Sequence, residues 1–279
     1  MKTIGFIGTG VMGSPIVRHL AQKNYRLNVF NRTTSKAEKL RDVAKVYTDV
    51  SLLIKESGII FTMLGFPNDV KQIYDIILDV AKPNTIVIDM TTSSPKLALE
   101  LYRKGKEKNI KILDAPVTGG EVGAINGTLT MMVGGDIEVF EQMKDLFSVF
   151  AKNINYIGGS SLGQKAKLAN QVAIAGAIWG VAESLSFAKN SDIHIDTMLQ
   201  ILNSGSAYSW QSMNNGNKMI TKDFKPGFYI KHFVKDLKLA LEESNTDLPL
   251  VRNVIRMYES LDEETYGKEG IQALIRYYK

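Results

Sequence analysis

Short apolar runs alternate with charged, amphipathic segments through the first half of the chain. The runs have the length and β-branched content of buried strands and cover residues 3–8, 26–31, 43–47, 59–64, 85–89, 110–114 and 128–133. Segments with helical spacing lie between several of them, at 15–23, 35–42 and 94–109. Because strands that alternate with helices need crossover connections, this half predicts a doubly wound, mainly parallel sheet.

The pattern changes after residue 162. Residues 163–189 have helical spacing with apolar residues nearly all round, which predicts a long helix buried on most sides. Further helical segments follow at 195–204, 213–219, 234–246 and 249–261, with a short one at the end of the chain. We therefore predict an α/β domain over residues 1–162 and an all-α domain over residues 163–279.

A glycine-rich loop directly follows the first predicted strand. Its sequence is Gly8-Thr9-Gly10-Val11-Met12-Gly13, and a helix follows at once. In a G-x-G-x-x-G loop the first glycine permits a tight turn, and the second lets the backbone approach a pyrophosphate. The third lets the helix pack closely on the strand, and the helix N-terminus attracts the anion. The loop therefore predicts a Rossmann-type domain that binds a dinucleotide.

The end of the second predicted strand bears on which dinucleotide binds. An acidic residue at this point would bind the ribose 2′-hydroxyl of NAD, but the chain has Asn31-Arg32-Thr33. A guanidinium pairs bidentately with a 2′-phosphate, which a carboxylate would repel. We therefore predict a preference for NADP. The alternatives are that Arg32 is a solvated loop residue or stacks on the adenine.

Composition narrows the classes of function. Among 279 residues, Lys and Arg number 34 and Asp and Glu number 29, a net charge of +5 without the basic runs of a nucleic-acid interface. The absence of cysteine excludes disulfides, cysteine-based zinc sites and thiol nucleophiles, and it fits a reducing compartment. The longest apolar run, residues 172–182, is shorter than the about 18 residues that a membrane span needs. We expect a cytoplasmic protein with no nucleic-acid partner, membrane segment or metal site.

Lysine is the best candidate for the group that exchanges the hydroxyl proton in a dehydrogenase. Lys167 lies near the start of the long helix, and Asn170 and Gln171 follow at i+3 and i+4, on the same face. A desolvated lysine has a lowered pKa and serves as acid and base near neutral pH. From spacing alone, a lysine that solvates a helix end is an equal alternative. The histidines are expected to be structural: His19, His194 and His232.

Several ordered motifs along nearly the whole chain resemble those of one enzyme family, the beta-hydroxyacid dehydrogenases. This group includes 3-hydroxyisobutyrate dehydrogenase, tartronate semialdehyde reductase and the glyoxylate/succinic semialdehyde reductases. The motifs are GFIGTGVMGSPIVRHL (5–20), DMTTSSP (89–95), DAPVTGG (114–120), GTLTMMVGG (127–135), GQKAKLAN (163–170) and KDL (235–237).

The resemblance implies an NADP-dependent oxidoreductase that interconverts a small β-hydroxy acid and its semialdehyde or keto acid. Lys167 would be the general acid/base. The substrate carboxylate would be held by Thr118, Gly119 and Gly120, and the substrate oriented by Asn170 and Gln171. The cofactor would be lined by Met63, Leu64, Thr92, Phe228 and Lys235, and Lys231 and Asp236 would help close the cleft. The resemblance also implies a small carboxylate-bearing substrate and a homodimer or homotetramer packed through the helical domains.

Two departures from the family pattern bear on the substrate. Thr118 stands where the family usually has serine, and its methyl group narrows the pocket. Gln171 stands where the family has its orienting asparagine, which would shift the substrate by about one methylene.

Other functions remain open at this point. Imine reductases share the two-domain plan but usually lack the lysine. The 6-phosphogluconate dehydrogenases carry a histidine and a glutamate near it and a longer C-terminal region. A non-catalytic NADP-binding interaction protein is a further alternative. Residues 159–163 (GSSLG) also fit the G-x-S-x-G pattern of a hydrolase nucleophile.

Overall fold

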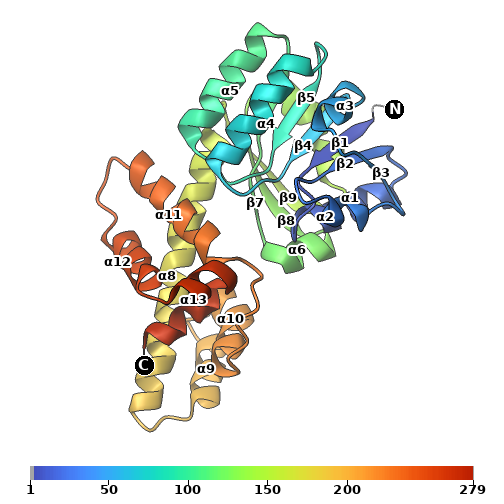
Figure 1. Cartoon of the computed structure of the whole chain (residues 1–279). Coiled ribbons are helices and arrows are strands. Elements are labelled where there is room, and N and C mark those ends of the chain that lie inside the picture. The colour runs from blue at the N-terminus through green and yellow to red at the C-terminus, as the bar shows by residue number, and fades with distance from the viewer. Residues whose placement is uncertain (1–2, 279) are drawn as a thin grey trace. The chain divides into compact units, whose positions relative to one another are not determined.

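A computed structural model describes residues 3–278 of the chain (Figure 1). It divides into two compact units with the boundary between Lys167 and Leu168. The helix α8 (Leu162–Asn190) begins in the first unit and continues into the second. Its first residue coincides with the end of the α/β domain that the sequence predicts.

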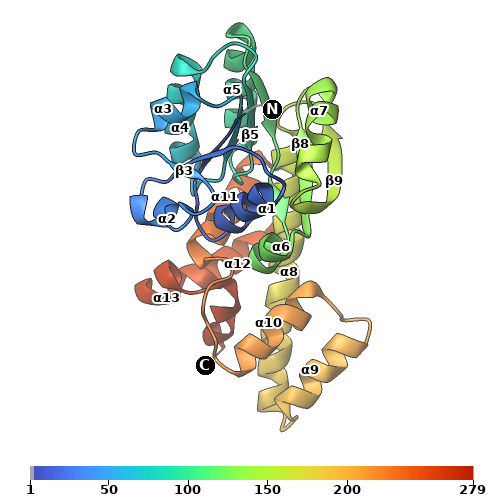
Figure 2. The same cartoon turned by 90° about the vertical axis from the view of Figure 1, so that its right-hand side faces the viewer.

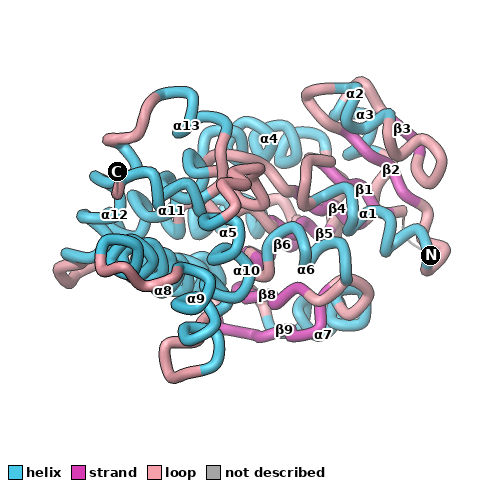
Figure 3. Tube along the Cα trace, turned by 90° about the horizontal axis from the view of Figure 1, so that it is seen from below, coloured by secondary structure: helices cyan, strands magenta, loops and turns pink. Residues whose placement is uncertain are grey.

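The first unit is built on one sheet. Its strands are β1 (Ile4–Ile7), β2 (Leu27–Phe30), β3 (Lys45–Val46), β4 (Ile59–Thr62), β5 (Ile86–Asp89), β6 (Lys111–Asp114), β7 (Val117–Thr118), β8 (Leu129–Gly134) and β9 (Ala151–Gly158). Their order is β3-β2-β1-β4-β5-β6-β8-β7, with β9 paired to β8. The six strands from β3 to β6 are mutually parallel. Figure 3 shows β2 and β3 at one end of this series and β8 and β9 at the other.

Helices cover both faces of the sheet. They are α1 (Gly13–Gln22), α2 (Thr34–Glu38), α3 (Val50–Lys55), α4 (Pro67–Val80), α5 (Pro95–Glu107), α6 (Gly120–Asn126) and α7 (Ile137–Phe147). Alternation along each strand divides the apolar residues between two cores. Phe6 and Phe61 pack with α1 and α7, whereas Ile7 and Ile60 pack with α3, α4 and α5. The α/β, doubly wound fold predicted from the sequence is confirmed.

Three details of the first unit differ from the sequence prediction. The helix expected at 35–42 ends at Glu38, because Leu40 and Arg41 donate to carbonyls only three residues back and the chain continues as turns. The strand expected at 43–47 is reduced to Lys45–Val46 at the edge of the sheet. The third detail is direction: β8 runs antiparallel to both β6 and β7. The connection from β7 to β8, residues 119–128, is shorter than the about a dozen residues or more that a crossover to a parallel strand needs.

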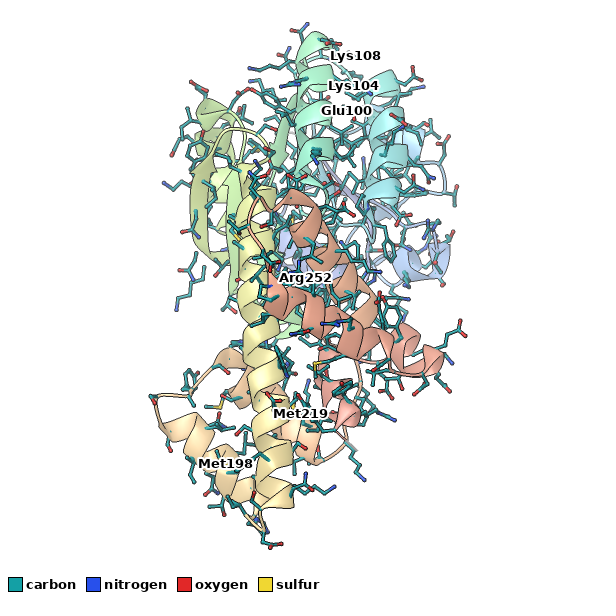
Figure 4. The ribbon with its side chains drawn as sticks, turned by 90° about the vertical axis from the view of Figure 1, so that its left-hand side faces the viewer. Glu100, Lys104, Lys108, Met198, Met219 and Arg252 are labelled. Carbon is teal, nitrogen blue, oxygen red and sulfur yellow. The ribbon has the colours of Figure 1, made fainter. Side chains whose placement is uncertain are left out.

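The second unit is helical. After α8 come α9 (Ile195–Ser204), α10 (Trp210–Ile220), α11 (Ile230–Glu243), α12 (Pro249–Glu259), α13 (Glu263–Lys268) and a 3₁₀ helix, η1 (Ile271–Tyr277). Figure 2 shows α9 and α10 side by side, and Met198 and Met219, labelled in Figure 4, belong to these two helices. The helix α10 begins at residue 210, earlier than expected, because the Ser209 hydroxyl accepts a hydrogen bond from the Ser212 N–H and caps it.

One helix of the described residues, α8, is long and apolar enough to cross a bilayer by length and composition. Of its most apolar window, 39% is buried inside the protein, and core helices of soluble proteins pass the same test. Residues including Ala175, Ile178 and Ala182 lie in the core of the second unit.

Exposed charged residues of both signs lie along α5. Figure 4 labels Glu100, Lys104 and Lys108 along α5. Lys104 pairs with Glu100 at 2.6 Å, with both side chains about half exposed. Such exposed pairs add little to stability. On α5, basic and acidic side chains lie side by side.

Candidate active site

The glycine loop is shaped by two close backbone approaches. Gly8 has φ +104°, and a Cβ there would lie 2.1 Å from the carbonyl oxygen of Met63. A Cβ on Gly13 would lie 2.1 Å from the carbonyl oxygen of Gly8. Neither site admits a side chain. Gly10 differs, because a Cβ there would meet nothing within 4 Å, which leaves room for a ligand against the backbone.

The end of β2 supports this loop. The Asn31 side chain accepts from the Thr9 N–H at 3.0 Å and donates to the Thr33 carbonyl at 3.0 Å. Asn31 therefore links the glycine loop to the turn at Thr33. This structural contact adds to the cofactor role predicted for Asn31. Arg32 is 83% exposed and pairs with Asp69 of α4 at 2.9 Å. No carboxylate follows β2 directly in the sequence, and the acidic partner of Arg32 comes from α4 instead.

The parallel strands β1, β2, β4 and β5 end at the same edge of the sheet, where Gly8, Asn31, Met63 and Met90 follow them. This is the edge at which α/β sheets bind ligands. The two segments after β4 and β5 are tied together, because the Leu64 N–H donates to the Thr91 hydroxyl at 2.9 Å. Thr92, one of the predicted cofactor residues, is half-buried between Thr91 and Ser93, which are both buried.

A buried carboxylate holds the first turn of α8. Asp114, at the end of β6, accepts from the backbone N–H groups of Ser161 at 2.8 Å and Gln164 at 2.9 Å. Burial raises the pKa of Asp114 to about 6, although these two hydrogen bonds to the carboxylate lower it. The sequence analysis assigned neither Asp114 nor Gln164. The signals in the sequence were an aspartate at the end of a predicted strand and a glutamine one turn before the candidate lysine.

Lys167 is buried, with 6% of its surface exposed, whereas Lys165 two residues earlier is exposed. The opposite environments follow from helical geometry, which points residues i and i+2 in nearly opposite directions. A buried lysine is uncommon. Of the two lysines in this turn, only Lys167 is enclosed by the protein.

The amides that follow on α8 belong to the second unit and bond to each other. Gln171 is fully buried. Its amide N–H₂ donates to Asp236 at 2.8 Å, and its oxygen accepts from the Asn170 amide at 3.0 Å. Lys235 pairs with the other oxygen of Asp236 at 2.8 Å. Gln171 thus uses its donor and its acceptor inside the protein, and one of these bonds holds the half-buried Asn170.

The predicted substrate turn follows β7. Thr118 is half-buried, and Gly119 and Gly120 have φ of +121° and +61°, which favour glycine. A Cβ on Gly120 would meet nothing within 4 Å, so its backbone is open to a ligand. Phe228, predicted to line the cofactor, lies in the second unit and packs on Phe233 with ring centroids 5.8 Å apart. Lys231, three residues after Phe228, has its ammonium group over the Tyr229 ring.

The structure therefore divides the predicted site residues between the two units. The first unit carries the glycine loop, Asn31, Arg32, Thr33, Met63, Leu64, Thr92, Thr118, Gly119, Gly120 and Lys167. The second carries Asn170, Gln171, Phe228 and Lys235. His19 lies outside this group: its Nε2 is 3.1 Å from the Ala124 carbonyl and 3.0 Å from that of Ile125, at the end of α6. Among the described residues, no three His, Asp or Glu side chains cluster as metal ligands.

Comparison with known proteins identifies the family. Residues 3–158 match the NAD binding domain of 6-phosphogluconate dehydrogenase, and residues 161–278 match the NAD-binding domain of NADP-dependent 3-hydroxyisobutyrate dehydrogenase. The chain therefore belongs to the beta-hydroxyacid dehydrogenase family, as the motifs indicate. It is an oxidoreductase that uses a nicotinamide cofactor and acts on the CH–OH group of hydroxy acids. This membership rules out the hydrolase interpretation of residues 159–163.

Individual relatives agree. An uncharacterized oxidoreductase of Bacillus subtilis, YkwC, is 40% identical over 99% of this chain and 98% of its own length. The 2-hydroxy-3-oxopropionate reductase of Escherichia coli is 36% identical over 86% of this chain and 84% of its own length. The structure of Mycobacterium tuberculosis 3-hydroxyisobutyrate dehydrogenase with L-serine has a TM-score of 0.89 at 26% identity, covering 99% of this chain and 98% of that one.

Proposed function

We propose that the enzyme uses NADP(H) to interconvert a small β-hydroxy acid and its semialdehyde, with Lys167 as the general acid/base. The observation that carries this proposal is the burial of Lys167 in α8, whose first turn is bonded to Asp114 at the end of β6. Lys165, two residues earlier, is exposed. The similarity to an enzyme that reduces 2-hydroxy-3-oxopropionate supports a semialdehyde of this size.

The chain's own residues divide the work. The nicotinamide supplies or accepts the hydride when it is bound. Lys167 donates a proton to the carbonyl oxygen during reduction and takes it back from the hydroxyl during oxidation. The backbone of Gly119 and Gly120 and the hydroxyl of Thr118 hold the substrate carboxylate. Backbone N–H groups in a turn suit such an anion, and the space at Gly120 is open to a ligand. Asn170 orients the reacting oxygen, and Gln171 fixes Asn170.

A panel of substrates tests this function. Purified enzyme is assayed for NADPH oxidation with glyoxylate, succinic semialdehyde, tartronate semialdehyde and methylmalonate semialdehyde, and with a cyclic imine as the outlier. Turnover of a semialdehyde that carries a carboxylate supports the proposal, and loss of turnover with its uncharged methyl ester supports the carboxylate cradle. Turnover of the imine alone would show imine reductase chemistry on the same fold and would overturn the proposal.

Replacing Arg32 with serine is expected to raise the KM for NADPH about 10- to 100-fold and to leave the KM for NADH nearly unchanged. The guanidinium is exposed at the end of β2 and supplies the charge that a 2′-phosphate needs. The Arg32 side chain is exposed in its ion pair with Asp69, so stability should change little.

The matched control is Arg41→Ser. Arg41 is also exposed and forms an ion pair with Glu38. Its substitution removes the same charge from the same region of the first unit. Its ratio of NADPH to NADH efficiency should equal that of the wild type. Equal KM values for the two cofactors in the wild type, or equal effects of the two substitutions, would contradict the role of Arg32.

We also propose that the chain forms a homodimer or homotetramer in the cytoplasm, with no nucleic-acid or membrane partner. Large apolar side chains of the second unit are exposed in the single chain: Phe187, Ile201, Tyr208, Trp210 and Met213. Exposed aromatic and methionine side chains on one helical unit are typical of subunit interfaces. Light scattering after size exclusion decides the assembly: a monomeric mass would refute it, and a fixed dimeric or tetrameric mass would support it.

A further inference from the structure

Gln164 makes hydrogen bonds to three residues that lie in two separate segments of the first unit. Its side chain is fully buried. The amide oxygen accepts from the Ser93 N–H at 2.8 Å, and the amide nitrogen donates to the Thr91 carbonyl at 2.7 Å. Its own backbone N–H donates to Asp114 at 2.9 Å. One residue on the first turn of α8 therefore fixes the segment after β5 and is itself fixed by the end of β6.

The segment that Gln164 holds is the one that carries Thr92. The two bonded groups belong to the residues immediately before and after Thr92, so the amide spans it. The same segment is also bonded to the one that follows β4, because the Thr91 hydroxyl accepts from the Leu64 N–H. The Thr91 N–H donates to Asp89 at the end of β5. The backbone around Thr92 therefore has no independent freedom while the Gln164 bonds persist.

Gln164 also lies one helical turn before Lys167. Residues i and i+3 of an α-helix are neighbours on one face, separated by about 4.5 Å along the axis. The first turn of α8 cannot shift easily, since a Cβ on Gly163 would already lie 2.5 Å from the carbonyl oxygens of Asp114 and Met132. The position of Lys167 relative to Thr92 is thus set through one buried amide.

We infer that Gln164 is a positioning residue, which fixes the acid/base lysine relative to the segment that lines the nicotinamide. The inference rests on the proposed function, which makes Lys167 the acid/base, and on the place beside the cofactor that the family resemblance implies for Thr92. A primary amide is required, because the site needs one acceptor for Ser93 and one donor for Thr91. Small misplacements between reacting groups cost about 10²-fold in rate, so the bonds matter for catalysis beyond their contribution to folding.

The test uses two substitutions of similar shape. Gln164→Met keeps the length and makes neither bond, and we expect kcat to fall about 10- to 100-fold at every pH. Gln164→Glu offers only acceptors when ionised, but when protonated it donates to Thr91 and accepts from Ser93 as the amide does. Its kcat relative to the wild type should therefore be low at pH 8 and recover about tenfold towards pH 5.5, since burial raises the pKa of the new carboxyl.

The matched control is Gln272→Met in the second unit. Gln272 is also buried, and its amide donates to the carbonyls of Asp223 and Lys225 at 3.0 and 2.9 Å. This substitution removes two side-chain to backbone bonds of the same kind, so it should lower the melting temperature while kcat keeps the wild-type pH profile. A Gln164→Met variant that behaves like Gln272→Met would reduce Gln164 to a structural residue and overturn the inference.

Hydrogen exchange separates this inference from the proposed function. The Ser93 amide should lose protection in Gln164→Met and keep it in Lys167→Ala, with no substrate present. Unchanged protection in Gln164→Met would show that the Gln164 amide does not hold the Ser93 segment, and would overturn the inference. Lost protection with wild-type kcat, in an enzyme that needs Lys167, would overturn the positioning role. Wild-type activity in Lys167→Ala would instead overturn the proposed function, and the role inferred for Gln164 in catalysis with it.

Discussion

Lys167→Ala is expected to lower kcat for semialdehyde reduction about 10²- to 10⁴-fold, the contribution typical of a positioned general acid. The variant can still bind both ligands, so KM for NADPH should change little. Lys167 is buried, and alanine in its place removes the proton donor without adding a buried polar group. Loss of activity is therefore expected without loss of fold, which urea unfolding would check.

Two further variants make this result specific. Lys165→Ala removes the same charge from the exposed face of the same helical turn and should keep wild-type kcat. Lys167→Arg keeps the positive charge but cannot release a proton near neutral pH, and it should be as inactive as the alanine variant. An active arginine variant would show that the positive charge, rather than proton transfer, is what the site requires, and would contradict the assigned role.

The features that the sequence predicts well are those set by neighbouring residues. The glycine loop occupies six consecutive positions directly after a strand, so its turn, its helix start and its ligand follow from local rules. The environments of Lys165 and Lys167 follow from helical period alone. The division of the chain into α/β and all-α parts also follows, since it depends on the periodicity of whole segments.

The contacts that support the site come from distant parts of the chain, and local rules do not reveal them. Gln164 bonds Thr91 across 73 positions, and Asp114 bonds the Gln164 backbone across 50. The sequence offered only a weak signal for these residues, because an isolated buried aspartate has many possible partners. The same holds for Gln171, whose bond to Asp236 spans 65 positions. From spacing it resembles a substrate ligand, whereas the structure shows its amide engaged within the protein.

The glycines of the loop are required for different reasons, so substitutions at Gly13 and Gly10 should have different effects. Gly13→Ala is expected to destabilise the fold by about 1–3 kcal/mol, because its methyl group would lie 2.1 Å from the Gly8 carbonyl and the backbone must move. Gly10→Ala should leave the free energy of unfolding nearly unchanged, since a methyl group there meets nothing within 4 Å. Its space is the one that the pyrophosphate needs, so NADPH affinity should fall about 10- to 100-fold.

Urea unfolding and NADPH fluorescence titration, run on both variants, distinguish these two roles. Gly10→Ala should unfold like the wild type without cofactor and gain much less stability than the wild type when NADPH is added, because ligand stabilisation depends on affinity. Gly13→Ala should unfold earlier with or without NADPH. If Gly10→Ala binds NADPH as tightly as the wild type, the pyrophosphate does not lie against Gly10, and the cofactor assignment of the loop must change. If both variants lose stability equally, the loop is limited by its own packing, and the open space over Gly10 is not a ligand site.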